Sequence, residues 1–175
     1  MYKKILINSI IIFILSVLLH SLYHYLPCFL TSIFAPVNES IWEHMKIIFS
    51  SYMLYLLIKK LFFKKQENNL VTSFTISSII NIIIFLIIYI PVYLIFKENL
   101  IVTLIILFIT IVISNYIMYK IQDKKINEKI NKYSIYLIPL VYIIFTILTY
   151  FPIKGKLFID PITNTYGIIK SHYYY

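Results

Sequence analysis

Long apolar stretches separated by short lysine-rich segments are the feature that most constrains this chain. Several stretches reach about 20 residues, enough for a helix to cross a hydrocarbon core of roughly 30 Å. Inside a bilayer every backbone N–H and C=O must find a partner within the protein, so such a stretch folds as an α-helix. The sequence therefore predicts an all-α fold, a polytopic membrane helix bundle.

The composition excludes an ordinary soluble domain and a nucleic-acid-binding one. The chain is 61% hydrophobic and 13% charged, whereas a soluble domain carries about 25% charged residues. The net charge is +9, but the lysines flank the apolar stretches and do not form the single basic patch that a nucleic acid requires. We expect the lipid bilayer as the partner and a multi-pass location in the cell membrane; a protein partner or homo-oligomer is left open.

Hydropathy and charge predict five transmembrane helices in a single domain, 1–175. The first follows "MYKK" and has no small-residue cleavage site after it, so we interpret it as an uncleaved helix. The second is the weakest, because its uninterrupted apolar part is only about 18 Å long. It needs protein neighbours or snorkelling lysines to span. The predicted helices cover 5–26, 41–63, 71–96, 100–119 and 133–152, and a tail covers 153–175.

The lysines between the helices predict the orientation. Eleven lie on one side: Lys3, Lys4, Lys59, Lys60, Lys64, Lys65, Lys120, Lys124, Lys125, Lys129 and Lys132. Five lie on the other: Lys46, Lys97, Lys154, Lys156 and Lys170. Because cytoplasmic loops carry the excess of positive charge, we expect the N-terminus inside and the C-terminus outside. The loop before the second helix and the tail then meet the same outer face.

The loop "APVNESIWEHMK", 35–46, concentrates polar chemistry in a chain with only seven acidic residues and four histidines. Counting along the helices puts His20 about 24 Å above Lys4, and His44 about 22 Å above Lys59. These depths agree, so a polar layer is expected near the outer interface. Its members are His20, His24, Glu39, Glu43 and His44.

Ionisable groups at this depth cost a few kcal/mol each unless they are paired, so they should face the bundle or a water-filled cavity. His20 and His24 share a helix face at i,i+4 spacing, which is also a metal-pair spacing. One hypothesis is a metal-dependent membrane hydrolase acting on a lipid or another membrane-embedded substrate. It assigns Zn²⁺ to His20, His24 and His44, the role of general base to Glu43 or Glu39, and the orientation of a metal ligand by hydrogen bonding to Asp160.

Structural interpretations of the same residues stay open. "SIWE" is typical of a capping box with Ser40 as N-cap and Glu43 at the third helical position, and Asn38 is an alternative cap. Trp42 is typical of an interfacial aromatic belt. Glu39, Glu43 and Lys46 would lie along one stripe of the second helix. The layer can therefore be a structural or ligand-binding network, and the sequence leaves enzyme status undecided.

Other functions have less support. A transporter is disfavoured because the spans hold no ionisable residue near mid-membrane, and a pH or redox sensor would rest only on the histidines and Cys28. In the tail, Asp160-Pro161 and Tyr166-Gly167 form turns. We expect the tail to fold over the outer mouth and bring Asp160 towards the polar layer, with His172 solvated.

The paired histidines, "PVNESIWEHMK" and the late "LFIDPITNTYG" together resemble a family of small bacterial membrane proteins of unknown function. The resemblance is specific at the loop and suggestive in the first helix and the tail. This sequence has Asn164 where that pattern implies a glycine. The resemblance supplies no activity. The specific positions are Asn38, Glu39, Ser40, Trp42, Glu43, His44 and Lys46, and the suggestive ones are His20, Asp160, Tyr166 and Gly167.

Overall fold

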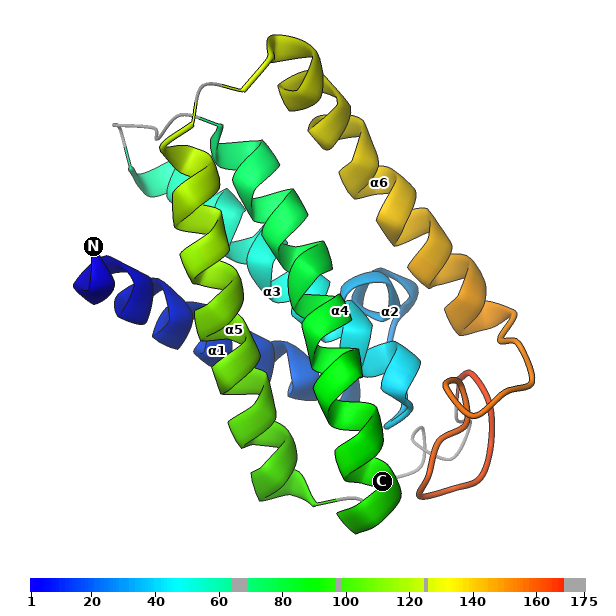
Figure 1. The fold of residues 1–175 in the computed structure, drawn as a ribbon. Helices are drawn as coiled ribbons and strands as arrows, with labels where there is room; N and C mark the ends of the chain where they lie inside the picture. The colour runs from blue at the N-terminus through cyan, green and yellow to red at the C-terminus, as the bar shows by residue number, and fades with distance from the viewer. Residues whose placement is uncertain (64–68, 97–98, 125, 169–175) are drawn as a thin grey trace.

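A computed structural model describes residues 1–63, 69–96, 99–124 and 126–168, and within them the regular structure is helical apart from one isolated bridge, Ile159 to Tyr166. The all-α prediction holds for these residues. Lys64, Lys65, Lys97, Lys125, Lys170 and His172, which the sequence predictions used, lie outside them. The six helices of Figure 1 are α1 (Tyr2–Tyr25), α2 (Phe29–Phe34), α3 (Ile41–Phe62), α4 (Leu70–Phe96), α5 (Leu100–Gln122) and α6 (Glu128–Tyr150).

Four helices are long and apolar enough to cross a membrane by length and composition. Their surfaces carry large apolar side chains: Ile87 is 66% exposed, Ile101 70% and Ile143 55%. Apolar surface on this scale suits lipid rather than water, so the chain has the character of a membrane protein. The four segments are Tyr2–Tyr25, Leu70–Phe96, Leu100–Gln122 and Lys129–Tyr150.

The remaining long helix, α3, is not among these four, because it carries Glu43 and Lys46 near its start and two lysines in its last turn. It is enclosed instead. All but one of the residues from Met45 to Leu56 are buried, and α3 packs against both α1 and α4, lying behind α4 in Figure 1. Protein neighbours thus supply what the sequence of this helix lacks in hydropathy.

Small polar side chains join the helices inside the bundle. Asn115 of α5 donates to the Ser9 hydroxyl of α1 at 2.8 Å, and Gln122 of α5 donates to the Ser73 hydroxyl of α4 at 3.1 Å. Serine lets neighbouring backbones approach closely, and each interhelical hydrogen bond adds roughly 1 kcal/mol or less. Helix packing here therefore uses hydroxyls in place of glycine.

The short helix α2 was not predicted from the sequence. Its six residues are too few to register as a hydropathy peak, although Pro27 and Pro36 bracket them. The backbone N–H of Cys28 donates to the Thr31 hydroxyl at 3.2 Å at its start. The hydroxyls of Ser32 and Tyr150 lie 3.0 Å apart and connect α2 to the end of α6. This helix places backbone carbonyls beside the start of α3.

The tail folds back onto the start of α3, as predicted. Trp42 donates its backbone N–H to Leu157 O at 2.9 Å, and the Asn38 side chain donates to Gly167 O at 2.8 Å. Gly167 has φ of 70°, and a Cβ there would lie 3.0 Å from Thr149 O. Only glycine fits both the left-handed backbone and this close approach.

Candidate metal centre

The loop before α3 is held by its own hydrogen bonds. Ser40 is the N-cap and its side-chain oxygen accepts from the Glu43 backbone N–H at 3.4 Å, which confirms the predicted cap. Asn38 Oδ1 accepts from the Ser40 backbone N–H at 2.9 Å. Because the Asn38 amide also donates to the tail, the loop is fixed at both ends. A rigid loop can hold a functional side chain in one place.

Glu39 precedes the helix and does not share its first turn. Ser40 has an extended backbone with φ −68° and ψ 154°, and α3 begins only at Ile41. The predicted stripe of Glu39, Glu43 and Lys46 therefore does not form, because helical periodicity starts after Glu39. Instead, Glu39 contacts His20 of α1, whereas Glu43 contacts Val37 of the loop and Thr149 of α6.

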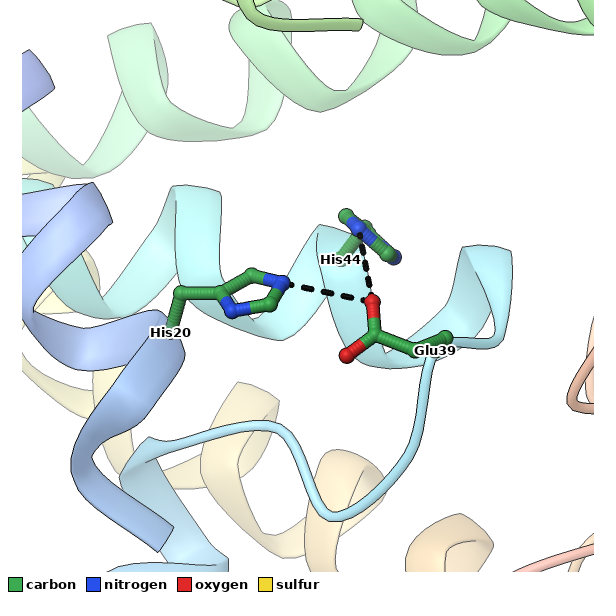
Figure 2. A group of neighbouring side chains, drawn as sticks. All are labelled: His20, Glu39 and His44. Carbon is green, nitrogen blue, oxygen red and sulfur yellow. Dashed lines mark ion pairs between the residues drawn. The ribbon is translucent and has the colours of Figure 1, made fainter. Parts of the chain in front are cut away.

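His20, Glu39 and His44 come together in one cluster (Figure 2). Both imidazole Nε2 atoms face the same Glu39 oxygen, at 3.3 Å for His20 and 3.8 Å for His44. The two ring centroids are 5.6 Å apart. One ligand atom from each residue lies within 4.8 Å of the other two. α1, the loop and α3 each contribute one member. The depth estimate had placed all three in one polar layer together with His24 and Glu43.

The orientation of the His44 ring follows from its backbone contact. His44 Nδ1 lies 2.9 Å from Ser40 O. A carbonyl oxygen only accepts hydrogen bonds, so Nδ1 carries a proton and Nε2 is the ring nitrogen that faces Glu39. Metal-binding histidines are commonly fixed in this way by a hydrogen bond from the second ring nitrogen. The Ser40 contact therefore orients His44 with Nε2 toward the cluster.

The donor set fits a divalent transition metal. Two imidazoles and one carboxylate are a known ligand set for catalytic zinc, which keeps its fourth position open. Bonds of about 2.0–2.2 Å in a tetrahedron separate neighbouring ligand atoms by about 3.4 Å, close to the 3.3 Å and 3.8 Å found for the two histidine nitrogens and Glu39. Small side-chain shifts would complete the geometry.

The cluster borders a polar cavity of about 280 Å³ that the tail helps to close. His20 and Glu39 line it together with His24 and Asp160. His24 lies one turn beyond His20, about 6 Å further along the helix, and packs its ring on Tyr25. It lies on the cavity wall but outside the three-residue cluster. The structure thus groups Glu39 with two of the three predicted histidine ligands.

Asp160 is 2% exposed and shapes the turn of the tail. Its Oδ1 accepts from the backbone N–H of Ile162 at 2.7 Å and of Thr163 at 3.2 Å. Asn164 follows with φ of 53°, a left-handed conformation that asparagine tolerates better than other non-glycine residues. This accounts for asparagine at a position where the resemblance implied glycine.

Glu43 and Lys46 form a separate, fully buried ion pair. Lys46 Nζ lies 2.5 Å from Glu43 Oε2 and also donates to Ser32 O at 2.7 Å. The Thr149 hydroxyl donates to Glu43 Oε1 at 2.7 Å, and the Val37 backbone N–H donates to Oε2 at 3.0 Å. Both carboxylate oxygens are thus engaged away from the cavity. This favours a structural role for Glu43 over the general-base role proposed from the sequence.

Two other predicted residues belong to the docking of the tail. Trp42 stacks on Phe158 of the tail and packs on Phe145 of α6, with ring centroids 4.9 Å and 5.1 Å away. Its ring thus packs against the tail and α6, and the interfacial belt stays a prediction. Tyr166 pairs with Ile159 in the isolated bridge. Neither is part of the three-residue cluster.

Sequence reasoning missed Thr149 and the backbone of Ser32 as partners of the buried pair. Thr149 is 106 residues from Glu43, and no local pattern marks it. A buried lysine needs several hydrogen-bond acceptors. That requirement was the one signal in the sequence that Lys46 would have partners besides Glu43.

Comparison with known proteins gave one result. Residues 1–168 match the model of a family of unknown function (DUF6512). Neither a curated protein nor a solved structure was found to match the chain.

Proposed function

Because this chain belongs to a family of unknown function (DUF6512), we propose its function from the site alone: a metal-dependent membrane hydrolase with zinc held by His20, Glu39 and His44. One observation carries the proposal. Three donor atoms from separate segments lie within 4.8 Å of one another beside a polar cavity. Catalytic zinc requires such a set with one open position.

The chemistry divides between the metal and the chain. When bound, zinc lowers the pKa of a coordinated water to about 7 and polarises the bond to be broken. The His44–Ser40 contact fixes the ring that binds it. Asp160 lines the same cavity and keeps Oδ2 free of the two backbone hydrogen bonds that Oδ1 accepts; this oxygen would accept the proton of the attacking water and return it to the leaving oxygen. One water is consumed and one bond is broken.

We also propose five membrane spans with α3 as the fifth, the N-terminus in the cytoplasm and the metal centre on the outer face. The lysine distribution supports this orientation. α3 supports the fifth span because its charged start is neutralised within the protein by the Glu43–Lys46 pair. Tagging both termini and testing their access to a membrane-impermeant reagent would show whether they lie on opposite sides.

Zinc should bind the purified protein and raise its melting temperature. After removal of bound metal with a chelator, titration should reach one zinc per chain. At a free zinc concentration of 100 times Kd the gain is about 2.7 kcal/mol, or roughly 5–10 °C for a chain of this length. Metal analysis should include iron, because iron also uses two histidines and a carboxylate. A preparation that takes up no metal and shows no shift would contradict the proposal.

Asp160→Asn should abolish hydrolysis while keeping the fold and the metal. Asparagine keeps the oxygen that accepts from Ile162 and Thr163 but removes the proton acceptor, so the rate should fall about 100-fold or more. The measurement is product release from a total lipid extract in proteoliposomes, by mass spectrometry, with zinc content and melting temperature determined in parallel. Unchanged product release would remove Asp160 from the mechanism.

A further inference from the structure

A second cavity, of about 200 Å³, adjoins the metal centre. His20 and His44 are part of its wall, and the remaining wall residues lie on α1, α3, α4 and α5. Most of them are apolar, among them Ile48, Phe85 and Leu104. His20 thus lines both the apolar cavity and the polar cavity, whereas His44 lines the apolar cavity.

This apolar cavity opens toward the surface that faces lipid. Val17 of α1 and Leu100 of α5 line it, and they are 44% and 71% exposed. Both belong to helices that are long and apolar enough to cross a membrane. A hydrocarbon chain can therefore reach the cavity past these exposed residues from the bilayer without passing through water.

The lining selects the chemistry of the occupant. An apolar cavity of about 150 Å³ in a soluble protein stays dry and takes up apolar molecules, and this cavity is of comparable size. A ligand that fills this cavity and the polar one together needs a hydrocarbon chain joined to a polar head. The junction of chain and head would then lie beside His20, which lines both cavities.

We propose that the apolar cavity binds the hydrocarbon chain of the substrate, an amphiphile whose hydrolysable group joins the chain to a polar head. This rests on the proposed metal-dependent hydrolysis, which supplies the reaction at that junction. For an acyl ester, water adds its oxygen to the acyl carbon, the bond to the alcohol oxygen breaks, and a fatty acid and an alcohol leave. In this binding mode the hydrocarbon chain lies in the apolar cavity and the polar head lies in the polar cavity.

The test uses the full chain in phosphatidylcholine nanodiscs and a saturated fatty acid with a diazirine near the end of its chain. Irradiation should label peptides that line the cavity. Leu104→Trp fills the cavity, whereas Ile105→Trp on the same helix points outward from a position that is 54% exposed. Labelling of the α1 and α3 walls should be lost in the first variant, because the indole fills the volume that the hydrocarbon chain would occupy, and stay unchanged in the second.

Zinc content, measured on each variant, separates this inference from the function on which it rests. Equal labelling of all lipid-facing helices, or no difference between the two tryptophan variants, would overturn the hydrocarbon site. Cavity labelling that is lost only in Leu104→Trp, in a protein that binds no zinc, would reject the metal-dependent hydrolysis and retain the hydrocarbon site. Leu107→Ala provides a second variant. It removes side-chain volume from the wall of the same cavity and so enlarges the cavity, and it should preserve or increase labelling.

Discussion

Glu43→Gln should destabilise the protein by about 3–5 kcal/mol, the usual result of removing one partner of a buried ion pair. The Glu43 side chain is 2% exposed and that of Lys46 0%, so the remaining ammonium would stay buried without a counter-charge. The pair also connects the loop through Val37 and α6 through Thr149. Thermal unfolding in detergent is the measurement.

The double variant Glu43→Gln with Lys46→Met provides the internal control. It removes both charges, and replacement of a whole buried pair is often close to neutral. The double variant should therefore be more stable than Glu43→Gln alone. In metal-free protein, Glu39→Gln is the matched single control, because that side chain is 33% exposed and exposed pairs contribute about 0–1 kcal/mol. Equal effects of Glu43→Gln and Glu39→Gln would contradict the structural role.

His20→Ala, Glu39→Ala and His44→Ala should each lower zinc affinity by more than about 100-fold, beyond the loss usual for groups that only support the ligands. Each removes one of the three clustered donors. Competition with a chromophoric chelator measures the affinity. Because the cluster is partly exposed, the metal-free variants should melt close to the metal-free wild type.

His24→Ala is the matched control on the same helix. His24 lines the polar cavity but stands outside the three-residue cluster, so its loss should change zinc affinity by much less. A loss as large as that of His20→Ala would instead support the three-histidine set that the sequence predicted. Together with the Glu43 series, these variants separate metal binding from folding.

The sequence predicted the helices well because their signals are local. Ser40 was recognised as a cap from "SIWE", and helix bounds agreed closely except at α6, which begins at Glu128 rather than at residue 133. The shared depth of His20 and His44 also followed from counting residues at a constant rise. Length, periodicity and capping need no knowledge of which helices are neighbours.

The roles of the carboxylates were not accessible in this way. Glu39 and Glu43 have helical spacing, yet one lies before the helix and the other within it. Their environments depend on His20 of α1 and Thr149 of α6, which are distant in sequence. The short helix α2, whose Ser32 carbonyl accepts from Lys46, adds a partner with no hydropathy signal.

The sequence by itself determined the all-helical, membrane-type architecture and the level at which its scarce polar residues gather, because hydrophobicity and helical rise act along one dimension. Only the tertiary structure decided that His20, Glu39 and His44 face one another while Glu43 and Lys46 neutralise each other out of reach of the cavity. The physical reason is that ligand geometry and charge pairing depend on which side chains packing brings within a few ångströms. Helix periodicity fixes the face of a residue but not its partner.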